Sequence, residues 1–111
     1  MSPVDIVQVQ LDAYNAQDLH RFCACFAPDA VLGDLNSSVT HEGIAGVRQR
    51  YAALFAEHPE NRADLLSRIA VGDVVVDEER ISRGKGAAPF RALAIYTVKS
   101  GLIARVDFVR E

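Results

Sequence analysis

Three turn signals divide the second half of this chain into four short segments. Glycine and its polar neighbours form these signals near positions 72, 84–89 and 100, and such residues are typical of hairpin turns. The segments between them, residues 65–71, 74–82, 90–99 and 102–110, have the length and composition of strands. The second half therefore predicts an antiparallel meander of four strands.

The first half has helical spacing instead. Ser2 and Pro3 suit a helix start, and apolar residues then recur every three or four positions until a helix end near Asn15. A second helix is predicted from Asp18 to a stop at Pro28, and a third ends at Pro59. Between the second and third predicted helices lie a strand, residues 30–35, and a polar loop, residues 36–40. Helices followed by a sheet indicate α+β architecture, in one domain that spans residues 1–111.

Asp34 is the first candidate functional residue. Side chains alternate between the two faces of a strand, so Asp34 shares a face with the apolar Ala30 and Leu32. If that face lines a cavity, the apolar surroundings raise the pKa of the carboxyl and make it a proton-transfer group. The alternative is a solvated carboxylate at the end of the strand.

The charge distribution argues against several classes of partner. The net charge is −3, and the only local basic cluster is Arg80, Arg83 and Lys85, whereas nucleic-acid binders carry larger groups of Lys and Arg. No charged leader with an apolar core begins the chain, and no apolar run is long enough to span a bilayer. We therefore expect neither nucleic-acid nor membrane binding, and a cytoplasmic location.

Metal and cofactor motifs are also absent from the sequence. Cys23 and Cys25 lie two apart in a predicted helix, so they point to different sides and neither bridge nor share a metal. His41-Glu42 begins like a zinc-protease motif, but Ala45 occupies the position of the second histidine. The chain has no phosphate-binding glycine loop and no dinucleotide fingerprint. We expect no metal and no cofactor.

The predicted strand at residues 90–99 suggests self-association. One of its faces carries Ala92, Ala94, Tyr96 and Val98, and the other carries Leu93, Ile95 and Thr97. A sheet with one solvated face alternates apolar and polar residues, so here both faces are expected to be covered. Helices would cover one face and a second copy of the chain the other, in a twofold homodimer through the sheet.

Four segments, in this order and spacing, carry a family resemblance. They are residues 15–19 (NAQDL), residues 26–31 (FAPDAV), Gly43 with Val47 and Tyr51, and residues 96–106 (YTVKSGLIARV). The chain resembles the nuclear transport factor 2-like superfamily, in the branch of ketosteroid isomerases and SnoaL-like polyketide cyclases. The resemblance implies a cone in which a curved antiparallel sheet wraps around the N-terminal helices, with a pocket at one end, and frequent dimers.

The resemblance also suggests site residues. Asp34 falls where the ketosteroid isomerases keep their general base, but the positions of their two oxyanion donors hold Gln10 and Ala94, so that isomerisation itself is not expected. Asp107 falls near the acid/base aspartate of the SnoaL-like cyclases, and Arg105 shares its strand face. The alternative is that Arg105 and Asp107 form a solvated pair on the outside.

Two classes of function follow from these residues. The first is cofactor-independent proton transfer on a small apolar carbonyl compound, of isomerase, cyclase or hydratase type, with Asp34, Asp107 and His41 as catalytic candidates. Tyr14, Tyr51, Arg91 and Arg105 are then the predicted ligand-binding residues. The second class is a non-catalytic module that binds a small ligand or dimerises. A fold alone does not decide between the two classes.

Overall fold

The computed structural model describes residues 1–111 and contains three helices and six strands. Three helices lie in the first half of the chain: α1 (Pro3–Ala16), α2 (Leu19–Cys23) and α3 (Gly43–Glu57). The strands are β1 (Phe26–Asp34), β2 (Val39–Glu42), β3 (Arg62–Val71), β4 (Val74–Ser82), β5 (Phe90–Lys99) and β6 (Leu102–Arg110). None of the helices is long and apolar enough to cross a membrane.

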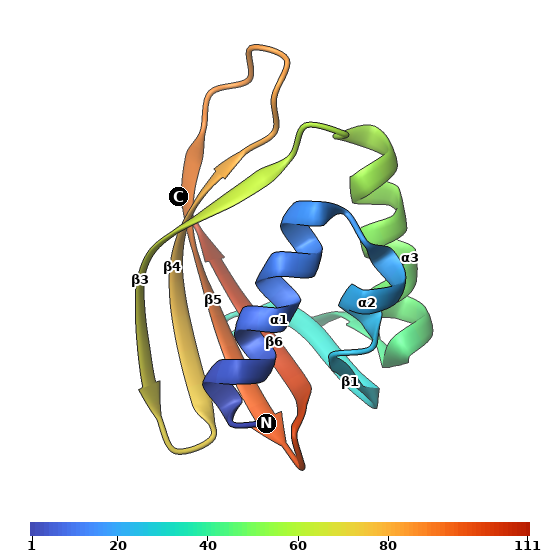
Figure 1. The fold of residues 1–111 in the computed structure, drawn as a ribbon, viewed down its shortest axis with the longest axis vertical. Coiled ribbons are helices and arrows are strands. Elements are labelled where there is room, and N and C mark those ends of the chain that lie inside the picture. Colours follow the sequence, from blue (N-terminus) through green and yellow to red (C-terminus); the bar gives the residue numbers. More distant parts are fainter.

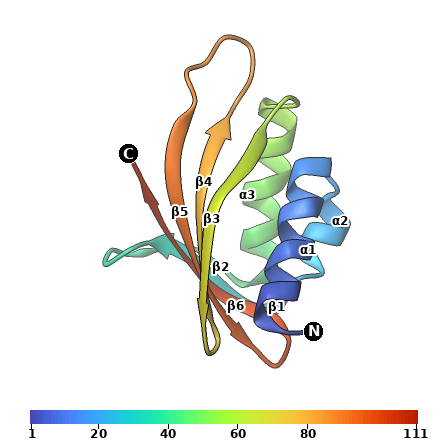
Figure 2. The ribbon, with the colours of Figure 1, turned by 60° about the vertical axis from the view of Figure 1, so that its left-hand side comes forward.

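All six strands form one curved sheet, in the order β2-β1-β6-β5-β4-β3. Figures 1 and 2 show that the helices cover one face of this sheet and leave the other face open. The predicted α+β class and the curved sheet around N-terminal helices are therefore confirmed. The sheet is mixed rather than antiparallel, because β1 pairs with β6 in parallel.

Two local predictions were wrong at the start of the sheet. The second helix ends at Cys23 and Pro28 lies inside β1. Pairing of β1 with β2 begins only at Val31, so the missing N–H of Pro28 lies at an unpaired edge where a strand tolerates proline. The predicted loop at residues 36–40 is a tight turn followed by β2, and His41 therefore lies on an edge strand.

The first helix begins as the sequence predicted. The Ser2 hydroxyl accepts a hydrogen bond from the Asp5 backbone N–H, and the Asp5 carboxylate accepts one from the Ser2 backbone N–H, each at 3.1 Å. This reciprocal cap satisfies two N–H groups that the first turn leaves without partners. It fixes the start of α1, whose inner face reaches the site described below.

The core lies between the helices and the concave face of the sheet. Phe22 is fully buried at its centre, and its ring contacts those of Tyr51 and Phe26 at centroid distances of 4.3 Å and 5.1 Å. Tyr14 and Phe55 complete this aromatic cluster. The cluster fixes α1, α2 and α3 against one another over the concave face of the sheet.

Candidate functional site

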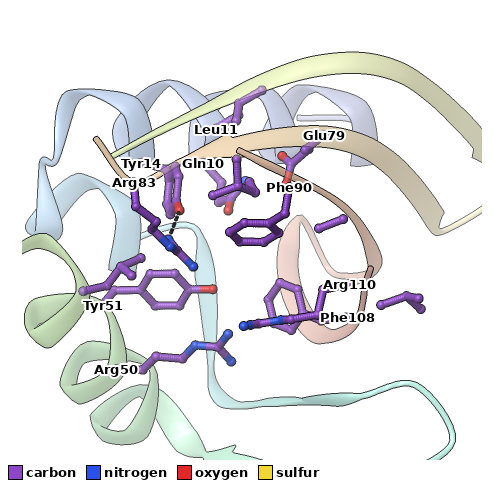
Figure 3. A pocket seen from close by; sticks show the side chains of 14 residues that line it. Gln10, Leu11, Tyr14, Arg50, Tyr51, Glu79, Arg83, Phe90, Phe108 and Arg110 are labelled. Atoms are coloured by element: carbon purple, nitrogen blue, oxygen red, sulfur yellow. Dashed lines mark hydrogen bonds between the residues drawn. The ribbon is translucent and has the colours of Figure 1, made fainter. Parts of the chain in front are cut away.

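A small apolar cavity lies between α1, α3 and the concave faces of β4, β5 and β6. Its volume is about 70 Å³. The walls include Leu11, Leu54, Ile81, Phe90, Ala92 and Phe108. Polar groups reach it from both layers: Gln10 and Tyr14 from α1, Arg50 and Tyr51 from α3, and Glu79 from β4 (Figure 3). Apolar walls with a few polar groups are typical of small-molecule sites.

Glu79 is the buried acid of this cavity. It lies on the inner face of β4 between Asp77 and Ile81, and it is only 7% exposed. Burial raises the pKa of the Glu79 carboxyl to about 7, the negative charge of Asp77 adds to the rise, and Arg68 opposes it. A carboxyl with a pKa near 7 exchanges protons readily at neutral pH, as a general acid or base must.

A buried ion pair holds the neighbouring acid. Asp77 is fully buried and accepts hydrogen bonds from Arg68 Nε at 2.7 Å and Nη2 at 3.0 Å. Arg68 reaches in from β3 and also donates to Gln8 Oε1 of α1 at 2.8 Å. This fork satisfies the charge of Asp77, so Asp77 acts on Glu79 as a fixed negative neighbour.

Two tyrosine side chains line the cavity from its helical side, Tyr14 from α1 and Tyr51 from α3. Asn61 Nδ2 donates to Tyr14 Oη at 2.6 Å, and Arg83 Nη1 donates to Asn61 Oδ1 at 2.7 Å. The Tyr51 hydroxyl makes no hydrogen bond within the protein, and Figure 3 shows it directed into the cavity. Burial raises the pKa of both Tyr14 and Tyr51. Both phenols are therefore neutral at pH 7 and able to donate hydrogen bonds.

An open groove adjoins the cavity. Its volume is about 660 Å³, and Arg50, Phe108, Val109 and Arg110 line both spaces. Asp34 and His41 lie on its wall, and Asp34 is exposed. Burial and the charge of Arg50 lower the pKa of His41, so its ring is neutral at pH 7. The structure thus brings Asp34 and His41 together beside the cavity, but not in it.

Asp34 stays outside the cavity because of where β1 ends. It pairs with Phe108 of β6, on the same sheet face as the buried Leu32 and Val106 pair. The strand therefore carries Asp34 on the concave side, as the alternation of side chains predicted. At this last residue of β1 the side chain has passed the packed core and opens into the groove.

Asp107 and Arg105 lie on the other face of the sheet. Their neighbours on β1 are Gly33 and Val31, whereas Asp34 pairs with Phe108 on the concave face. Arg105 Nε donates to Asp107 Oδ2 at 3.0 Å, and this contact raises the pKa of Arg105. Asp34 and Asp107 therefore share no cavity, and the structure does not support a paired role for them.

Of the remaining predicted ligand-binding residues, two line the cavity and one does not. Tyr14 and Tyr51 line the cavity. Arg91 does not, because it alternates outward from its inner neighbour Ala92 and lies 3.6 Å from Glu78 on the convex side. No group of three or more His, Cys, Asp or Glu side chains lies close enough together to hold a metal ion.

The sequence and the fold of this chain are similar to those of known proteins. The SnoaL-like domain family matches residues 7–106. This chain belongs to the SnoaL-like family. An uncharacterized cystatin-fold protein from Novosphingobium aromaticivorans has 32% identity and a TM-score of 0.93, over 99% of both chains. A putative polyketide cyclase from Sinorhizobium meliloti has 28% identity and a TM-score of 0.81, over 95% of this chain and 94% of that chain.

More distant structures extend the likeness of fold. An NTF2-like protein of unknown function from Cytophaga hutchinsonii has 12% identity and a TM-score of 0.82, over 100% of this chain and 91% of that chain. The predicted membership of the nuclear transport factor 2-like superfamily is thus confirmed. Among curated proteins, none matches the chain.

Sequence reasoning did not select Glu79, the buried acid of the cavity in this SnoaL-like protein, as a candidate site residue. Asp77 and Glu79 have the same parity along β4 as the buried Val75 and Ile81. Two acids flanked by apolar residues on one strand face were the available signal for a buried acidic row. A charged run near a strand end is usually solvated, and only the helices packed over β4 distinguish the two cases.

Proposed function

We propose that this SnoaL-like protein catalyses proton transfer on a small, largely apolar carbonyl compound, in a reaction of isomerase or cyclase type. The observation that carries the proposal is the Glu79 carboxyl, which is buried at an apolar cavity and has a pKa near 7. Family membership supports the same class of chemistry, since the relative from Sinorhizobium meliloti, at 28% identity, is a putative polyketide cyclase.

In the proposed reaction Glu79 acts first as a base. Its carboxylate takes the proton from a carbon next to the substrate carbonyl, the C–H bond breaks, and its electron pair moves into an enolate. The Tyr51 hydroxyl, with Tyr14 beside it, donates a hydrogen bond to the enolate oxygen. Protonated Glu79 then returns the proton to another carbon in an isomerisation, or to the alkoxide formed when the enolate attacks a second carbonyl in a cyclisation.

Exchange of carbon-bound hydrogen in heavy water tests this proposal. A panel of cyclic ketones is incubated with the protein, and loss of the α-proton signal is followed by NMR. We expect the parent to accelerate exchange and Glu79→Gln to lose about 100-fold or more of that rate. Glu78→Gln is the matched control, because Glu78 lies on the convex face of the same strand and bonds to Ser67; it is expected to keep the parent rate.

Asp34 is the competing base, and the same assay separates the two. Asp34→Asn is expected to retain most of the exchange rate, because Asp34 is exposed in the groove rather than buried in the cavity. A loss of exchange in Asp34→Asn with full exchange in Glu79→Gln would assign the base to Asp34. No acceleration by the parent with any ketone would contradict the enzymatic proposal and favour a binding module.

We also propose a homodimer through the convex face of the sheet. Ile69, Val76 and Ile95 are direct neighbours across β3, β4 and β5 on that face. Ile69 and Val71 are 67% and 75% exposed. Contiguous exposed apolar side chains on a sheet are characteristic of protein interfaces, and a second copy of the same face would cover them.

A further inference from the structure

Three arginines surround the cavity without a carboxylate partner. Arg50 and Arg110 line both the cavity and the adjoining groove, and Arg83 lines the cavity. All ion pairs of the protein lie elsewhere, so no carboxylate approaches the side chains of these arginines within 4.0 Å. Arg50, Arg83 and Arg110 are called the arginine trio below.

Aromatic rings hold the trio in place. The Arg50 guanidinium carbon lies 4.6 Å from the ring centroid of Phe108 and 5.5 Å from that of Tyr51. Those of Arg83 and Arg110 lie 5.3 Å and 5.9 Å from the centroid of Phe90. A ring face attracts the cation but accepts none of its in-plane N–H donors. In Figure 3 the three guanidinium groups reach toward the space between these rings.

Four arginines elsewhere in the protein have a carboxylate partner, unlike the trio. Arg62, Arg68, Arg91 and Arg105 each lie within 4.0 Å of a carboxylate. Within the trio, Arg83 Nη1 donates to Asn61 Oδ1 and makes a longer contact of 3.5 Å with Tyr14 Oη. Arg50 and Arg110 make no side-chain hydrogen bond. Most of the guanidinium donors at the cavity are therefore free for a ligand.

Two acids share this region, and neither neutralises the trio. Glu79 lines the cavity and Asp34 lines the groove. Neither lies within 4.0 Å of an arginine of the trio. The surroundings of the cavity thus carry three positive charges against at most two negative ones. The planar fork of arginine binds a carboxylate through two parallel hydrogen bonds.

We infer that the substrate is itself an anion, a small aromatic or alicyclic carboxylate whose carboxylate group binds to the arginine trio. Its ring lies against the apolar wall of the cavity, and the groove provides the room that the cavity of about 70 Å³ lacks. The inference rests on the proposed function, because it takes the cavity with Glu79 as the substrate site and adds the chemical class of the substrate.

Matched acid and amide pairs test the inference directly. Benzoate with benzamide, cyclohexanecarboxylate with cyclohexanecarboxamide, and 1-naphthoate with 1-naphthamide differ in charge but hardly in shape. Binding to the full chain is measured by isothermal titration calorimetry at pH 7.5. We expect at least one acid to bind about tenfold or more tightly than its amide, and this preference to shrink as salt is added.

Variants of the trio locate the binding group. Arg50→Gln and Arg110→Gln are each expected to weaken binding of the acid about tenfold and leave binding of the amide unchanged. Arg48→Gln is the matched control, because Arg48 lies on the same helix, is exposed and lines no cavity. Circular dichroism of each variant verifies that it folds. Equal affinity for acid and amide, or no binding of any acid at millimolar concentration, would overturn the inference.

The inference and the proposed function fail in different ways. Glu79→Gln is expected to keep arginine-dependent binding of the acid while it loses proton exchange. Arginine-dependent binding without exchange activity in the parent would refute the proposed function alone. Exchange of ketones by a parent that binds the acids no more tightly than the matched amides would refute the anionic substrate and leave the proton-transfer proposal standing.

Discussion

Replacing Glu79 by glutamine is expected to remove a pH-dependent cost of folding. The carboxyl has a pKa of about 7 in the folded protein, against an ordinary value of 4.5. Between these pH values the folded state holds a proton that the unfolded chain releases. The free energy of unfolding of the parent therefore falls as the pH rises from about 4.5 to about 7, because the unfolded chain is stabilised by ionising this carboxyl while the folded state keeps it protonated.

The size of this effect follows from the same pKa values. One pKa unit corresponds to about 1.4 kcal/mol, so the rise from 4.5 to about 7 corresponds to about 3 kcal/mol at pH 8 and above. Glutamine at position 79 does not ionise, and its contribution to stability does not change over this range. Relative to the parent, Glu79→Gln is expected to gain about 3 kcal/mol between pH 4.5 and pH 8.5.

Urea unfolding at a series of pH values measures this gain. Circular dichroism gives the free energy of unfolding of the parent, of Glu79→Gln and of the control Glu78→Gln at each pH. The difference between Glu79→Gln and the parent is expected to rise steadily with pH, and the control is not expected to reproduce that slope. Parallel pH profiles for the parent and Glu79→Gln would refute the assignment of Glu79 as the buried, weakly acidic carboxyl.

Three further predictions concern the surroundings of the site and the sheet. Asp77→Asn is expected to lower the pKa of Glu79 by about one to two units, because it removes a negative neighbour and leaves Arg68; a carbon NMR titration that still places the pKa near 7 would contradict this. Phe22→Ala is expected to cost about 3 to 5 kcal/mol of unfolding free energy, since the ring is fully buried; urea unfolding of Phe22→Ala and the milder Phe22→Leu measures it. Ile69→Lys with Val71→Lys is expected to convert a dimer to a monomer in analytical ultracentrifugation; a monomeric parent at tens of micromolar would contradict the proposed interface.

Most of the fold could be predicted from local patterns in the sequence. Glycine and polar residues mark the turns of the meander, so the predicted bounds of β4, β5 and β6 agree with the structure. The cap at Ser2 and the spacing of apolar residues likewise predict α1. Each of these features depends on residues a few positions apart, and local steric and hydrogen-bonding preferences determine them.

Errors occurred where pairing between distant segments decides the structure. The residues around Pro28 belong to a strand because β6, more than seventy positions later, pairs with Phe26. The short strand β2 exists because Val31 and Leu32 of β1 are available to pair with it. The pairing of β5 with β6 shifts register between Thr97 and Val98. Because of this shift, Ile103 and Val106 are both buried, although simple alternation would place them on opposite faces of β6.

The sequence by itself determined the α+β class, the meander and the face of β1 that Asp34 shares with Leu32, because periodicity and turn chemistry are properties of neighbouring residues. The superfamily followed from the resemblance of four segments to a known family. Only the tertiary structure decided which acid is buried. Asp34, Glu79 and Asp107 are similar acids on strands, and their exposure depends on whether a helix packs over that point of the sheet. Burial sets the cost of ionising a carboxyl, so the chemistry of the site resides in the packing and not in the residue types.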